Sequence, residues 1–182
     1  MTSAKPGAPK MLAPQEGRLI AGGGLHASLK VGGGPDADGA LASTFEITLP
    51  PGYDVGAHVH SIGEELFYVR TGTLDLLAFE PVERSPDDWH SWTSSSGQSY
   101  LRGGPGSVLF VPAGVPHAFA NLSADPAVML FQSAPAGHEH YFEELATVLR
   151  ESEGQPDPEA IRAIRARHDI HQLTNLKDGR RR

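Results

Sequence analysis

The sequence predicts an all-β domain, a small sandwich or barrel, on the strength of three observations. Its 182 residues include 21 glycines and 15 prolines, about a fifth of the chain, against roughly 12% in average proteins. Ten of the prolines lie between Pro35 and Pro135, which nearly excludes long helices there. From about residue 18 to residue 135, short apolar runs alternate with turn-forming residues, as in antiparallel β proteins. A chain of this length suits one domain with a single core.

Within that region, seven segments have the length and composition of strands. They are Leu25–Val31, Ala40–Leu49, Glu65–Arg70, Leu74–Phe79, Ser107–Val111, His117–Asn121 and Ala127–Gln132. Gly72 lies between the third and fourth segments, where a glycine allows the positive φ of a tight turn and so predicts a hairpin. Pro112 ends the fifth segment.

After Pro135 the pattern becomes helical. Apolar residues at helical spacing predict a first helix over Glu139–Ser152. Asp157 as N-cap and Pro158 in the first turn predict the start of a second helix. The expected organisation is a flexible arm over residues 1–17, a barrel over 18–135, and helices with a basic tail over 136–182. We expect the helices to cover an open end or face of the barrel.

Composition and charge exclude several classes of function. With nine histidines and no cysteine, the chain has no disulfide, thiolate metal site or thiol nucleophile. A net charge of −7 argues against a general nucleic-acid binder, and the only basic cluster, Arg180–Arg182, is expected to be a frayed tail. No stretch approaches the roughly 20 apolar residues that cross a bilayer, and the N-terminus lacks the apolar region of a secretory signal. We therefore expect a cytoplasmic protein with neither nucleic-acid nor membrane partners.

One segment carries candidate metal ligands. On a strand, His58 and His60 are two residues apart and point to the same face. After a turn, Glu65 stands opposite them at the head of an otherwise apolar row that continues with Phe67 and Val69. Glu64 offers a competing register for the carboxylate.

A second segment brings a third imidazole. Here a strand ends at Pro112, a tight turn uses Gly114, and His117 enters the next strand. Three imidazoles and one carboxylate suit one divalent transition metal (Fe, Mn, Ni, Co, Cu or Zn) and leave positions open for substrate or oxygen. A lone pair of strand histidines is more often a surface or packing feature, whereas the combination of all four residues favours a metal site.

These segments resemble the two motifs of the cupin superfamily. The pattern G-x5-H-x-H-x4-E-x6-G runs from Gly52 to Gly72, and G-x5-P-x-G-x2-H-x3-N runs from Gly106 to Asn121. All ten fixed positions are present. The resemblance implies a small jelly-roll barrel that binds one metal ion, and the implied ligands are His58, His60, Glu65 and His117.

Within that superfamily, a single domain followed by an acidic helical tail is most similar to small bacterial quercetinase-like cupins (quercetin 2,3-dioxygenase-like). The chain departs from the compact pattern because about 33 residues separate Gly72 from Gly106. The extra length, Glu83–Gln98, is expected to bear on the shape of the pocket mouth and therefore on the substrate class.

Several aromatic and imidazole residues outside the motifs are candidates for the pocket mouth. They are Trp89, His90 and Trp92 as a lid over a flat substrate, and His138, His140, Tyr141 and Phe142 at the entrance. The alternatives are that the tryptophan loop packs against the barrel, and that Phe142 is buried at a helix start while the histidines face solvent. A further set is expected in the core or pocket wall: Phe45, Phe67, Phe110, Phe119, Phe131 and Met129.

The leading functional hypothesis is a metal-dependent dioxygenase that acts on an aromatic or enolic small molecule of flavonol or polyketide type, with dioxygen as co-substrate. Glu65 has a second expected role as a catalytic base toward an acidic substrate hydroxyl. The alternatives are a non-oxidative isomerase, cyclase or dehydratase of polyketides or sugars, and a non-catalytic small-molecule binder. Exposed strand edges and the N-terminal arm favour a homodimer.

Overall fold

The computed structural model describes residues 9–33, 38–153 and 156–175. The first eight residues of the predicted arm and the predicted tail, Arg180–Arg182, lie outside this part of the chain. The described residues form twelve strands, one short 3-10 helix and two α-helices. Their bounds are β1 Arg18–Gly22, β2 Leu25–Val31, β3 Ser43–Leu49, β4 Tyr53–Asp54, β5 His58–Val59, β6 Glu64–Thr71, β7 Leu74–Ala78, η1 Trp89–Ser91, β8 Leu101–Gly103, β9 Val108–Val111, β10 His117–Asn121, β11 Ala127–Ala134, α1 His138–Glu151, α2 Pro158–Arg167 and β12 His171–Gln172.

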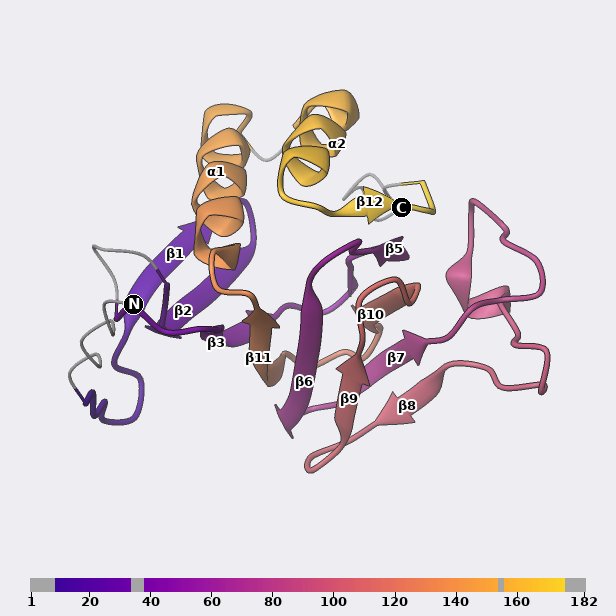
Figure 1. Cartoon of the computed structure of the whole chain (residues 1–182), viewed down its shortest axis with the longest axis horizontal. Helices are drawn as coiled ribbons and strands as arrows, with labels where there is room; N and C mark the ends of the chain where they lie inside the picture. The colour runs from indigo at the N-terminus through magenta and orange to yellow at the C-terminus, as the bar shows by residue number, and fades with distance from the viewer. Residues whose placement is uncertain (1–8, 34–37, 154–155, 176–182) are drawn as a thin grey trace, which may run out of the picture.

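The strands form two antiparallel sheets, and the predicted all-β jelly-roll class is confirmed. One sheet has the order β1-β2-β3-β11-β6-β9, and the other has the order β12-β5-β10-β7-β8, with β4 also paired to β10. Both helices lie on the same side of the sheets, α1 beside β1 and β2 and α2 beside β12 (Figure 1). The helices therefore close one end of the space between the sheets.

Strict alternation along β6 decides which side chains face that space. Glu65, Phe67 and Val69 are buried, whereas Glu64 is exposed. The register with β11 pairs Phe67 with Phe131, and the two rings stack with centroids 5.2 Å apart. A period of two along a strand requires this separation of faces, so placing Glu65 inward excludes Glu64 from the same site.

Aromatic rings fill the interior between the first sheet and α1. Phe45 of β3 stacks on Phe131 at a centroid distance of 5.8 Å and meets the edge of Phe142 at 4.9 Å. Phe142 comes from α1, so these ring contacts join the helix to the first sheet. Such edge and offset contacts add to the free energy of burying the rings.

The tryptophan loop covers the outside of the second sheet, so the predicted lid is wrong and the alternative, that the loop packs against the barrel, is confirmed. Trp89 and Trp92 are each 1% exposed and pack with Ala118 and Ala120, the outward-facing residues of β10. The indole Nε1 of Trp89 donates to Asp54 at 2.8 Å. Because side chains alternate along β10, these alanines and His117 lie on opposite faces of the strand. The loop therefore packs on the outer face of the strand that carries His117.

The other predicted mouth and core residues have mixed outcomes. His90 stacks on Trp89 at 3.7 Å within the same outer cluster, so its placement at the mouth is wrong. Phe110 was expected inside, but it is 52% exposed. The register of β9 with β6 pairs Phe67 with Leu109 and Glu65 with Val111, which turns Phe110 to the outer face. A continuous apolar run does not reveal which of its residues face inward.

The remaining differences concern boundaries and short elements. β3 begins at Ser43 rather than Ala40, and α1 covers His138–Glu151, one residue earlier than expected at each end. β4, β5 and β12 have two residues each, too few for any periodicity to predict. Neither helix in the described part of the chain has the length and hydropathy of a membrane span.

Candidate metal centre

β5 and the turn before β10 bring the two motifs together. His58 and His117 are direct partners in the register between β5 and β10. The amide of Gly114 donates to the carbonyl of His60 at 2.7 Å, which ties the end of β5 to the turn. Gly114 has a φ of +82°, a conformation that favours glycine. The glycine in the second motif therefore holds His60 beside the strand that carries His117.

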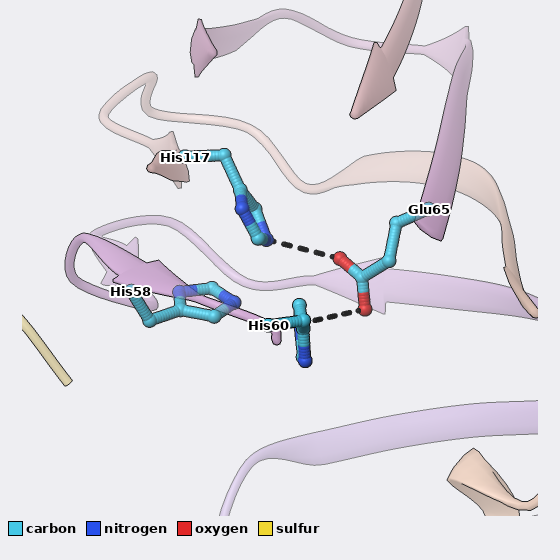
Figure 2. Close-up of side chains that lie close together, drawn as sticks. All are labelled: His58, His60, Glu65 and His117. Carbon is cyan, nitrogen blue, oxygen red and sulfur yellow. Dashed lines mark hydrogen bonds and ion pairs between the residues drawn. The ribbon is translucent and has the colours of Figure 1, made fainter. Parts of the chain in front are cut away.

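The four predicted ligand residues come together in the interior. Each offers one ligand atom, these atoms lie within 4.8 Å of one another, and all four residues are buried. Glu65 lies between two imidazoles, with Oε2 3.1 Å from His117 Nε2 and Oε1 3.2 Å from His60 Nε2 (Figure 2). His58 faces the same point from β5.

Backbone carbonyls determine the tautomers of the three imidazoles. Each Nδ1 lies against a carbonyl oxygen: His58 against Gly56 at 3.0 Å, His60 against Asp169 at 2.8 Å, and His117 against Val115 at 3.1 Å. A carbonyl oxygen only accepts, so each Nδ1 carries the proton and donates. In the neutral ring, Nε2 then keeps its lone pair, which is the form of histidine that binds a metal.

The four side chains of the cluster suit a bound metal cation. Three Nε2 lone pairs and one carboxylate are all acceptors, and bringing them together is unfavourable unless a cation or an extra proton lies between them. His60 Nε2 is buried and has no hydrogen-bond partner among the described residues. The cluster can therefore hold a divalent metal ion through three nitrogens and one oxygen, the donors that suit transition metals.

The electrostatics of the cluster agree with a cation site. Burial raises the pKa of Glu65, but the side-chain contacts with His117 and His60 and the positive charge that these rings can carry outweigh burial and hold the pKa of Glu65 well below its usual value. Burial lowers the pKa of His60. The side-chain contact with Glu65 and the negative charge of Glu65 outweigh burial and raise the pKa of His60. Burial lowers the pKa of His58 well below its usual value. The carboxylate is thus ionised and attracts positive charge to the centre of the cluster.

A segment far along the chain orients His60. Besides its carbonyl bond to His60, Asp169 accepts through its carboxylate from the amides of Ser61 at 3.0 Å and Ile62 at 2.8 Å. β12 follows at once and pairs with β5, with Gln172 opposite His58. The sequence reasoning missed Asp169, since nothing in the motifs refers to a residue more than 100 positions away.

The candidate metal cluster lies in the wall of an internal cavity. The cavity is narrow: its water-accessible volume is about 30 Å³, room for one or two water molecules, so a larger ligand requires the lining side chains to move apart. Most lining residues are apolar and come from both sheets and from α1. His58 and Glu65 line it from the cluster, and His138 and Arg165 line it from the helices.

The helical residues expected at the mouth divide into two groups. His138, Tyr141 and Phe142 line the cavity, whereas His140 has 65% of its side chain exposed and is not among the lining residues. His138 Nδ1 lies 3.8 Å from Glu65 Oε1, and burial lowers the pKa of His138 to about 4. At neutral pH His138 is therefore an uncharged ring beside the cluster.

An all-β barrel with a buried cluster of three histidines and one glutamate is a candidate metal-binding protein. A family model described as cupin matches residues 36–153, and the chain belongs to this family. A comparison with curated proteins gives no significant match.

Solved structures with a similar fold come from several bacteria. The polyketide cyclase RemF from Streptomyces resistomycificus is 20% identical with a TM-score of 0.50, and the match covers 70% of this chain and 80% of that one. A conserved double-stranded β-helix protein from Klebsiella pneumoniae is 14% identical with a TM-score of 0.49, covering 71% and 93%. KdgF from Halomonas sp. is 15% identical with a TM-score of 0.46, covering 64% and 85%.

Proposed function

We propose that this cupin is a metal-dependent dioxygenase, quercetinase-like, that acts on an aromatic or enolic small molecule. The observation that carries the proposal is the position of the acceptor cluster in the wall of an apolar cavity. The apolar lining suits the body of a flat molecule and the ligand cluster suits one of its oxygens, once the lining side chains move apart to admit the molecule. His58, His60, Glu65 and His117 are the proposed metal ligands.

A divalent metal in this cluster supplies a Lewis acid for an ionised enol or phenol oxygen and a redox route for dioxygen. The protein supplies the remainder. Three neutral imidazoles and one ionised carboxylate around a divalent metal leave the site with a net positive charge. This charge favours the ionised form of the substrate hydroxyl. The apolar wall, which includes Phe131 and Met129, excludes water from the reacting face.

Glu65 has a proposed second role as the base that takes the proton of that hydroxyl. Its lowered pKa keeps it ionised, which both roles require. Glu65→Gln separates them, because the amide keeps the shape of the side chain but accepts no proton. Metal content near the wild-type value with turnover reduced by a factor of 100 or more supports the base role. Loss of the metal shows that ligation requires the Glu65 carboxylate.

A non-oxidative reaction is the second candidate. The chain shares its fold with the polyketide cyclase RemF, and a cluster with nitrogen and oxygen donors also suits Zn²⁺, which has no redox chemistry. In that case the site performs a cyclisation, isomerisation or dehydration with the metal as Lewis acid. A non-catalytic small-molecule binder is the third candidate, because the fold itself does not select a reaction.

Oxygen uptake by the metal-loaded protein with a flavonol such as quercetin tests the proposal. Dioxygenase chemistry predicts consumption of one O₂ per substrate, no turnover under nitrogen, and loss of uptake in His117→Ala. Turnover that continues unchanged under nitrogen supports the non-oxidative alternative. Binding without any turnover supports the third candidate.

A further inference from the structure

Arg165 on α2 is a buried cation in the cavity wall. The residue is 6% exposed and lines the same cavity as His58 and Glu65. α2 lies beyond the part of the chain that the cupin family model matches.

The guanidinium lacks an ionic partner within the described chain. No carboxylate of the described residues forms an ion pair with Arg165, although eight pairs between a lysine or arginine and a carboxylate occur elsewhere in the described part of the chain. Its hydrogen bonds both use Nη1, one to the carbonyl of Val55 at 3.1 Å and one to the side chain of Gln172. Nε is buried and has no partner. Buried charges in proteins are normally paired, because an unpaired one loses its hydration without compensation.

A purely structural role for Arg165 leaves this arrangement unexplained. The two bonds through Nη1 fasten α2 to the segment before β5 and to β12, and an uncharged donor would suffice for them. Guanidinium has five N–H donors in a planar fork that matches a carboxylate or another anionic oxygen pair. The unused Nε–H and the uncompensated charge point to a group that is supplied from outside the chain.

We propose that Arg165 is the specificity-determining residue of the cavity and that the natural ligand carries an anionic oxygen group, a carboxylate or an ionised hydroxyl, on an apolar body. This inference rests on the proposed function, because it places the substrate of the metal site in this cavity. The apolar lining contacts the body of the ligand, the acceptor cluster faces one polar end, and Arg165 binds the anionic group.

The charge balance of the site agrees with this ligand class. A divalent metal, ionised Glu65 and three neutral imidazoles leave one net positive charge, and Arg165 adds a second. An anionic ligand therefore compensates charge that the described residues leave unbalanced, whereas a neutral ligand does not.

A matched pair of probes tests the proposal. 6-Hydroxy-2-naphthoate and its neutral amide, 6-hydroxy-2-naphthamide, share the apolar body and the hydroxyl and differ in charge at the other end. Calorimetry on the full chain loaded with redox-inert Zn²⁺, under nitrogen, measures binding without turnover. We expect the naphthoate to bind the wild-type protein at least tenfold more tightly than the amide.

Variants on one helix assign the preference to Arg165. In Arg165→Gln the ratio of the two affinities is expected to fall to within twofold of one, and Arg165→Lys retains part of it. Arg162→Gln is the matched control, because Arg162 lies on α2 with 40% of its side chain exposed and pairs with Glu159. It keeps the wild-type ratio. Thermal unfolding of each variant establishes that it is folded.

Three results would overturn the proposal: equal binding of both probes by the wild-type protein, no binding of either probe at millimolar concentration, or an unchanged preference in folded Arg165→Gln. The first two come from the wild-type protein and do not depend on the stability of a variant. Failure of the dioxygenase proposal is distinguishable, because it appears as absent oxygen uptake while the charge preference persists.

Discussion

The carbonyl oxygen of Asp169 accepts the Nδ1–H of His60 at 2.8 Å, across 109 positions of sequence. This bond fixes the tautomer of a proposed metal ligand from outside the barrel strands. The carboxylate of the same residue accepts two further amides from the turn after β5. Asp169 has a φ of +58°, so its backbone adopts the left-handed conformation while it makes these contacts. The segment around Asp169 is thus part of the candidate metal centre.

Loss of the Asp169 carboxylate is expected to weaken metal binding. Asp169→Gly removes both side-chain bonds to the turn and still tolerates the positive φ. Since residues that orient metal-bound histidines contribute about 10- to 100-fold to affinity, we expect a loss of about tenfold, measured by competition with a chelator. Glu153→Gly, at an exposed residue that also has a positive φ, is the control and keeps wild-type affinity. An unchanged affinity in Asp169→Gly would contradict the role of this anchor.

The same carboxylate predicts an acid-dependent part of the stability. Burial raises the pKa of Asp169, but hydrogen bonds from Ile62 and Ser61 outweigh this and lower it from 3.8 to about 2. A group with a depressed pKa in the folded state stabilises the fold above its unfolded pKa, and this stability is lost as the pH falls through the folded pKa. We expect about 1–2 kcal/mol to disappear as the pH falls from about 4 toward 2.

Urea unfolding of the wild type and Asp169→Asn across that range measures this contribution. Asparagine tolerates the positive φ and does not titrate, so the difference between the two proteins should shrink toward low pH. A difference that is independent of pH would assign the effect to packing instead of charge.

Trp89→Ala is expected to destabilise the fold without changing ligand preference. Truncating a fully buried tryptophan costs about 3–5 kcal/mol, and Trp89 lies outside the cavity on the far face of β10. Denaturant unfolding and naphthoate binding to the folded fraction measure the two effects. Val82→Ala, at a residue 71% exposed, should stay within about 0.5 kcal/mol of the wild type. A changed probe preference in Trp89→Ala would revive the lid hypothesis.

The predicted homodimer can be tested on one exposed apolar face. Tyr68 of β6 and Val108 and Phe110 of β9 are 40%, 55% and 52% exposed, and the strand register places them on the same outer face. We expect Phe110→Asp to convert a dimer into a monomer in light scattering, while Leu41→Asp, at a residue 90% exposed elsewhere, leaves the dimer intact. A monomeric wild-type protein at micromolar concentration would refute the dimer.

Local patterns in the sequence were sufficient to predict the centre of the barrel. His58 and Glu65 follow from spacing, because parity along a strand determines which side chains share a face, and the same parity separates Glu65 from Glu64. β2 has the predicted bounds, Leu25–Val31, since turn-forming residues flank it on both sides. These features depend on neighbours within a few residues.

Contacts between distant segments could not be predicted in this way. Asp169 and Arg165 reach the site through the path of the chain after α1, and no periodicity encodes where α2 and β12 return to β5. Phe110 shows that a local pattern can also fail, since a buried and an outward position look alike in a continuous apolar run. The tryptophan loop packs on the outer alanines of β10, a surface that the motif does not describe.

Metal content is the most direct test of the central claim that the four acceptor residues hold a metal ion. Elemental analysis of the purified full chain should find about one equivalent of a divalent transition metal per chain. His58→Ala and His117→Ala should each retain less than about a tenth of that amount, and the exposed control His140→Ala should retain all of it. Wild-type protein that carries no transition metal and takes up none on titration, or histidine variants that keep a full equivalent, would contradict the account.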